Sequence, residues 1–215
     1  MKWPRAHGAT ILLPMRPTLL LATLALLTLS GASVARDVNS FDYHGWHIDA
    51  SRASTQPREP LVAAVQKQID AIETRGIAQD IIAFMRTVPL HAVSTGTGST
   101  PAHYDRAKGL EFRADALDAS KPVLLPELLR AFHEQKLKSS AELISKAYEE
   151  SRASGTWPAD SAMMKSVDDF FVATSTVYLF GPIDTPPFTP GRMRETQPAY
   201  WQWLGEVFDG FRGCE

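Results

Sequence analysis

The sequence predicts an α+β domain that is rich in helices. Residues 121–135 have a wide apolar surface, and residues 166–180 are uncharged after Asp169, which is typical of helices in a protein core. Four further segments carry apolar residues at helical spacing, and the few strand-like stretches are short and precede residue 121. Many helices after a few short strands favour an α+β architecture.

The first 35 residues are predicted to be a secretory signal peptide. They contain a basic start, a short apolar core at 19–29 and a small-x-small cleavage site at Ser33-Val34-Ala35. The apolar core is shorter than the ~20 residues that span a bilayer, although an uncleaved anchor remains the alternative. We therefore expect a periplasmic or secreted protein with no membrane anchor after cleavage.

Residues 36–215 are long enough to form one domain with its own core. They would retain 19 basic and 24 acidic residues, a net charge of −5, without the clustered Lys and Arg that bind nucleic acid. Cys214 is the only cysteine, which excludes an internal disulfide. It either pairs between chains or is an incidental residue near the chain end.

The first elements are a strand at 41–50 and two helices at 59–74 and 77–87. The strand contains His44 and His47, which odd spacing places on opposite faces, so they are poor joint metal ligands. Gly76 and Pro89 mark the ends of the two helices.

Two more strands are predicted at 90–94 and 109–114. The loop at 95–101 is rich in Gly and Thr, but it lacks the spacing and the Lys of a phosphate-binding loop. Two strands around such a loop indicate a small antiparallel sheet.

The segment 121–135 is the helix around which the other predicted elements are arranged, with Ser120 as its candidate N-cap. Pro126 inside a helix that began near Pro122 would remove a backbone hydrogen bond and kink it. We therefore predict either a kink or a late start, at Leu125 or Pro126, where proline is tolerated.

Three helices are predicted after this segment, at 141–154, 166–180 and 197–208, with a proline-rich loop that extends to residue 191 before the last one. The first of them is expected to turn four side chains inward, namely Leu143, Ile144, Ala147 and Tyr148. In the last, Trp203 lies off the apolar stripe and is either a rim contact or part of a binding face.

Two blocks of sequence carry a resemblance to a known family. They read Leu124-Leu125-Pro126-Glu127-Leu128-Leu129-Arg130-Ala131-Phe132-His133 and Asp169-Phe170-Phe171-Val172. Together with residues near the C-terminus, they resemble small exported zincin-like metallopeptidases of the gluzincin, lethal-factor-like type, over roughly residues 105–208. Such enzymes hold zinc with an H-E-x-x-H helix and a carboxylate from a later helix. The resemblance implies a zincin-like fold, with a small antiparallel sheet packed on the motif helix.

The resemblance assigns roles that these residues only partly fit. Glu127 matches the general base, and Asp169 matches the third zinc ligand, one methylene short. Pro126 and Arg130 take the places of the two His; proline has no ligand atom and arginine repels a cation. The H-E-x-x-H motif is therefore degenerate.

Three more residues near these blocks have open roles. His133 is either a metal ligand or an ordinary hydrogen-bonded or surface His. Tyr148 and Tyr178 are either packing residues with a bonded hydroxyl or supports for an oxyanion.

Arg130 is expected to replace the metal by bridging Glu127 and Asp169 with its guanidinium fork. The sequence thus favours a catalytically inactive, cofactor-free protein that binds a peptide or protein partner. One alternative is an active zinc-dependent peptidase with unusual ligands, drawn from His133, Glu134 and Asp169, with His44, His47 and His91 as further candidates. A third interpretation is an envelope protein unrelated to peptidases.

Overall fold

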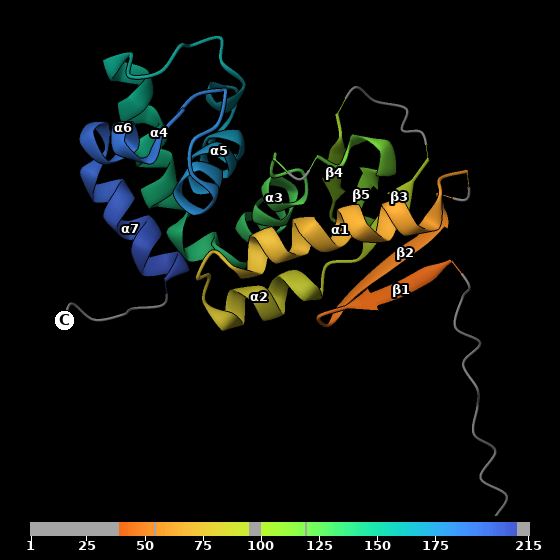
Figure 1. Cartoon of the computed structure of the whole chain (residues 1–215). Coiled ribbons are helices and arrows are strands. Elements are labelled where there is room, and N and C mark those ends of the chain that lie inside the picture. The colour runs from red at the N-terminus through yellow and green to blue at the C-terminus, as the bar shows by residue number, and fades with distance from the viewer. Residues whose placement is uncertain (1–38, 54, 95–99, 119, 210–215) are drawn as a thin grey trace, which may run out of the picture. The chain divides into compact units, whose positions relative to one another are not determined.

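The computed structural model describes residues 39–53, 55–94, 100–118 and 120–209 (Figure 1). The predicted signal peptide, most of the Gly-rich loop and Cys214 lie outside these residues. No helix in the described part of the chain combines the length and apolar character needed to cross a bilayer.

The described strands form one sheet of five, in the order β1-β2-β3-β5-β4. They are β1 (Ser40–Tyr43), β2 (Trp46–Arg52), β3 (Leu90–Val93), β4 (Ala102–Asp105) and β5 (Gly109–Arg113). β1 and β2 pair antiparallel, as do β4 and β5, whereas β3 lies parallel to both β2 and β5. The sheet is therefore mixed.

Two strand predictions were wrong. The single strand at 41–50 is a hairpin, because His44 and Gly45 take positive φ values of 48° and 82° and reverse the chain between β1 and β2. The prediction that the strands at 90–94 and 109–114 form an antiparallel sheet was also wrong, because β3 and β5 pair in parallel. The chain first forms the edge strand β4 and then turns back into β5, so β5 runs in the same direction as β3.

Alternation along the strands gives the sheet one apolar and one polar face. The buried face includes Ile48, Leu90 and Phe112, whereas His47, Asp49 and Glu111 point to the other side and are more exposed. Helix α3 contacts β4 and β5, and it lies between the sheet and the helices that follow it (Figure 1).

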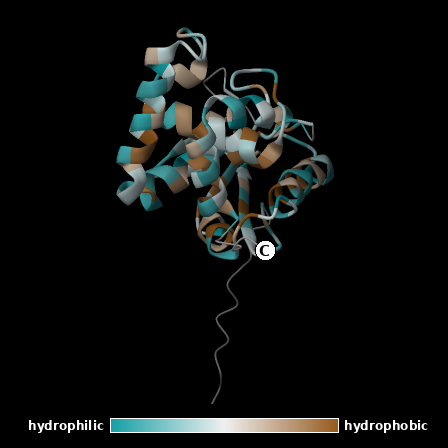
Figure 2. Cartoon of the chain, turned by 90° about the vertical axis from the view of Figure 1, so that its left-hand side faces the viewer, coloured by the Kyte–Doolittle hydropathy of each residue, from teal (hydrophilic) through white to brown (hydrophobic). Residues whose placement is uncertain are grey.

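Seven α-helices are assigned in the described residues. They are α1 (Arg58–Glu73), α2 (Gln79–Arg86), α3 (Leu124–Lys136), α4 (Ala141–Ser154), α5 (Val167–Phe180), α6 (Pro190–Thr196) and α7 (Pro198–Phe208). All but α6 were predicted to within a few residues. Their surfaces mix hydrophobic and hydrophilic residues, as amphipathic helices around a core require (Figure 2).

Helix α3 starts late, as predicted, but one residue before the predicted Leu125. The helix begins at Leu124, so Pro126 lies in its first turn, where a missing N–H removes no helical hydrogen bond. Ser120 is not the N-cap, because Val123 occupies that position without a side-chain cap of its own. The buried Gln68 of α1 supplies the cap, since its Oε1 accepts from the backbone N of Val123 at 2.9 Å.

Helix α5 is buried along most of its length, as predicted, and contacts α3, α4, α6 and α7. Ser166 caps its start by accepting a hydrogen bond from the backbone N of Asp169. On α4, the prediction that Leu143 points inward was wrong, because this residue is 40% exposed. On the helix, Leu143 lies beside the buried stripe, which is formed by Ile144, Ala147 and Tyr148.

Candidate functional site

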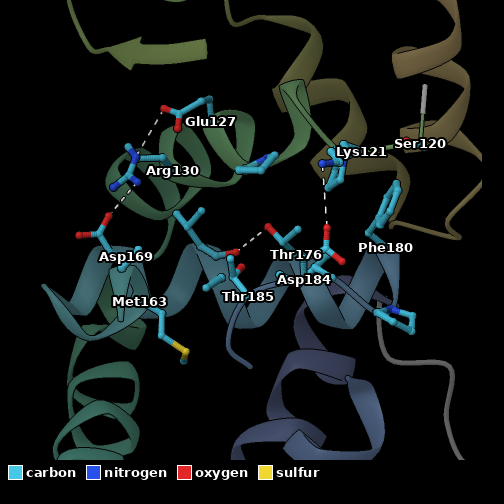
Figure 3. Close-up of a pocket in the computed structure, with 17 residues that line it drawn as sticks. Ser120, Lys121, Glu127, Arg130, Met163, Asp169, Thr176, Phe180, Asp184 and Thr185 are labelled. Carbon is cyan, nitrogen blue, oxygen red and sulfur yellow. Dashed lines mark hydrogen bonds and ion pairs between the residues drawn. The ribbon is translucent and has the colours of Figure 1, made fainter. Parts of the chain in front are cut away.

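A groove of about 700 Å³ lies between α3 and α5 (Figure 3). Residues 120–122 before α3 and residues 182–185 after α5 complete its walls. Much of the lining is apolar: Pro122, Pro126, Ala162, Met163, Val172, Ala173, Phe180, Pro182 and Ile183. The charged lining residues are placed at two points, Arg130 with its partners at one and Lys121 with Asp184 at the other (Figure 3).

Arg130 bridges the two carboxylates that the resemblance assigns to the zincin site. Its Nη2 donates to Asp169 Oδ1 at 2.9 Å, and its Nε lies 3.5 Å from Glu127 Oε2. The three side chains are partly buried, with 28%, 31% and 15% exposure for Arg130, Asp169 and Glu127. The predicted bridge is confirmed, and it joins the first turns of α3 and α5.

Neighbouring groups hold both carboxylates in position. Glu127 Oε2 also accepts the backbone N–H of Tyr104 on β4 at 2.8 Å. Asp169 Oδ2 accepts the hydroxyl of Ser166, the N-cap of α5, at 2.8 Å. The sheet edge and the α5 cap thus fix the partners of Arg130.

The zincin arrangement of ligands is not present at this position. Pro126 lines the groove without a ligand atom, and the cationic guanidinium of Arg130 occupies the space between Glu127 and Asp169. A dication there would have to displace the guanidinium, which already pairs with the same two acids. The residues present do not fit zinc.

His133 and Glu134 lie one turn further along α3 and do not line the groove. His133 Nδ1 pairs with Asp168 at 2.9 Å, and its ring stacks on Phe171 with the centroids 4.7 Å apart. Burial lowers the pKa of His133, against the opposing effect of Asp168. Glu134 instead forms an ion pair with Arg106 at 3.3 Å.

The other histidines proposed as alternative ligands belong to the sheet and its hairpin. His44 contacts Glu73 at 3.0 Å, and His47 and His91 each contact an aspartate, Asp42 and Asp49. They are not brought together with one another or with Asp169. Apart from the gaps at 54, 95–99 and 119, residues 39–209 contain no group of three His, Cys, Asp or Glu that could hold a metal ion.

Tyr148 and Tyr178 do not line the groove. The Tyr148 hydroxyl is buried and donates to the carbonyl of Met164 at 3.0 Å. The Tyr178 hydroxyl donates to Asp209 at 2.8 Å, and burial together with this carboxylate raises its pKa. Both are packing residues with a bonded hydroxyl.

Sequence reasoning missed the wall formed by residues 182–185 and the ion pair between Lys121 and Asp184, 3.9 Å apart. The proline-rich composition after α5 indicated an ordered or semi-ordered loop, but no local signal indicated that it folds back over α5. Trp203, left open above, stacks on Tyr200 at a centroid distance of 5.5 Å and meets the edge of Phe171. It packs on the protein interior and does not line the groove.

A comparison of this chain with protein-family models, curated proteins and solved structures found no match.

Proposed function

We propose that this chain is an exported, non-catalytic binding protein on a zincin-like scaffold, and that its α3–α5 groove holds a peptide segment of a partner. The observation that carries this proposal is the Arg130 bridge between Glu127 and Asp169 at one end of an open groove.

The non-catalytic part of the proposal rests on the chemistry of the site. A zincin hydrolyses peptides with a metal-bound water, which needs two imidazoles and a carboxylate as ligands. Here Pro126 and Arg130 replace the imidazoles, and Arg130 pairs with the carboxylate that would complete the set. The bridge supports a scaffold that kept its groove and lost its metal.

The binding part rests on the groove itself. Its volume of about 700 Å³ falls within the ~300–1,000 Å³ typical of ligand pockets. An apolar lining with a few polar groups at fixed points is the composition expected of a recognition site. A short extended peptide fits this space and chemistry.

The test uses a mixture of synthetic hexapeptides incubated with the purified protein, with and without added Zn²⁺. We expect peptides to be retained without cleavage under both conditions, as measured by mass spectrometry. The variant Ala173→Phe, which fills the groove from α5, should lose retention, whereas Ala153→Phe on the exposed side of α4 should keep it.

Two results would count against the proposal. Zn²⁺-dependent cleavage would establish the alternative of an active peptidase. If the wild type retained no peptide, or if Ala173→Phe and Ala153→Phe retained peptides equally, the groove would not be a peptide site.

A further inference from the structure

The charged residues that line the groove carry an excess of negative charge. Lys121 and Arg130 supply two positive charges, whereas Glu127, Asp169 and Asp184 supply three negative ones. Lys121 and Asp184 lie together, so the excess falls at the Arg130 end, where one cation faces two carboxylates.

Adjacent groups do not remove this excess. Asp168 precedes Asp169 and is paired with His133, whose lowered pKa favours the neutral imidazole at pH 7. The N-termini of α3 and α5 each contribute about half a positive charge, near Glu127 and near Asp168 and Asp169, respectively. Together with Arg130 they supply about two positive charges, which is less than the three negative charges of these carboxylates. This end of the groove therefore attracts a cationic group.

The same end also has unused hydrogen-bonding capacity on both sides of the bridge. Among the described residues, Glu127 Oε1 accepts no hydrogen bond, and Arg130 Nη1 donates none. An occupant that satisfies both must present a donor and an acceptor a few ångströms apart. Side chains with only an ammonium, such as lysine, leave the arginine donor unpaired.

The first residue of a peptide meets these requirements. Its α-ammonium has three donors and a positive charge, and its own carbonyl oxygen, an acceptor, lies three bonds away from the nitrogen. Its side chain and the next residues would then follow the apolar wall formed by Val172, Ala173 and Phe180.

On the basis of the proposed binding function, we propose that the groove recognises the free amino terminus of a peptide that begins with apolar residues. The α-ammonium lies against Glu127 and Asp169, and the first carbonyl accepts from Arg130.

The test compares three synthetic hexapeptide pools that share an amidated C-terminus. The first begins with Leu, Val or Phe and has a free amino terminus; the second has the same sequences but is acetylated. The third is acetylated and begins with Lys. Dissociation constants are measured for the wild type, for Glu127→Gln, and for the matched control Glu134→Gln, which lies on α3 outside the groove.

We expect the free-amine pool to bind about tenfold more tightly than the acetylated pool, the scale of one charge-assisted contact. Glu127→Gln should abolish this preference, and Glu134→Gln should retain it. The wild type alone provides a second measurement that needs no variant. Its preference should disappear as the pH rises above about 8, where the α-amino group loses its charge.

The contrary outcomes are distinguishable. Equal binding of the free and acetylated pools, abolished by Ala173→Phe, would overturn this inference and leave the peptide-binding function intact. Tightest binding of the Lys pool would overturn the choice of the amino terminus. Failure of all three pools to bind would overturn both proposals.

Discussion

Arg130 determines the chemistry of the candidate site because its charge stands between two carboxylates. Glu127 and Asp169 come from different helices, and a guanidinium can bridge them without a metal. The side chains are partly exposed, so solvent screening reduces the contribution of the bridge to stability. Its main consequence is that the guanidinium occupies the space between the two carboxylates in which a metal ion would have to lie.

The residue-scale prediction concerns recovery of a metal site. In the triple variant Pro126→His, Arg130→His and Asp169→Glu, two imidazoles lie four residues apart on α3, and a longer carboxylate faces them from α5. We expect near-stoichiometric Zn²⁺ in elemental analysis of the variant and none in the parent. Without metal, the variant should unfold at a lower temperature, because Glu127 loses its partner Arg130. Added Zn²⁺ should reverse this loss, since it binds only the folded state.

The matched control is the variant that carries only Asp169→Glu and keeps Arg130. It should not bind Zn²⁺, because the positive charge remains and no imidazole is added. If the triple variant folds but does not bind Zn²⁺, then α3 and α5 do not correspond to the metal-binding helices of a zincin. Stoichiometric zinc in the parent, lost to a chelator together with stability, would contradict the non-catalytic interpretation.

At the scale of elements, the position of α3 depends on a side chain from α1. Gln68 Nε2 donates to the carbonyls of Asp118 and Lys121 at 2.6 and 2.8 Å, while its Oε1 accepts from the backbone N of Val123. One buried amide therefore caps α3 and fixes the segment that precedes it. That segment forms one wall of the groove, so α1 positions this wall although no residue of α1 lines the groove.

We therefore predict that Gln68→Leu, which nearly conserves volume, lowers the free energy of unfolding by roughly 2–3 kcal/mol. The cost arises because buried backbone groups lose their partners. Chemical denaturation measures it, and Gln66→Leu on the same helix, at a less buried position, is the control, with an expected change under about 0.5 kcal/mol. Similar effects of both substitutions would show that the cap contributes little.

At the scale of the whole molecule, stability should fall as the pH decreases. Burial lowers the pKa of His133 below its ordinary value of about 6.5. His133 therefore binds a proton more readily in the unfolded chain than in the folded one. The free energy of unfolding decreases as the pH falls below about 6.5, the pKa of His133 in the unfolded chain. At lower pH, carboxylates add to this loss. Burial favours a higher pKa for Glu73, but hydrogen bonds from Arg86, Trp46 and His44 outweigh it and lower the pKa.

The corresponding experiment measures thermal unfolding between pH 7.5 and pH 5. We expect the midpoint of the wild type to decrease over this range and the decrease to be smaller in His133→Gln, which keeps a donor for Asp168 but has no proton to bind. His103→Gln, at an exposed position of β4, should behave as the wild type. A midpoint that rises toward pH 5, or an unchanged slope in His133→Gln, would contradict the prediction.

Local signals were sufficient to predict most helices of this protein. Apolar periodicity located α1, α4 and α7, because a helix at the protein surface keeps one polar face towards solvent. The uncharged stretch after Asp169 located α5, which is buried along most of its length. Proline chemistry left two alternatives for α3, a kink or a late start, and the structure has the late start. Pairing of Arg130 with Glu127 followed from their spacing of three residues along one helix. The pairing of Arg130 with Asp169 could be predicted only from the family resemblance, which implies that the two separate helices face each other.

Other features were decided only by tertiary structure, because they join segments that are far apart in the chain. The direction of β5 relative to β3 depends on the edge strand β4, which carries too weak a pattern to be recognised alone. Gln68 caps a helix that begins more than 50 residues later. The groove depends on the loop at 182–185, and His44, His91 and His133 are separated by the fold although sequence allowed them a common site. Sequence determined most of the helices and the pairing of Arg130 with Glu127, whereas long-range packing determined what else the Arg130 charge faces.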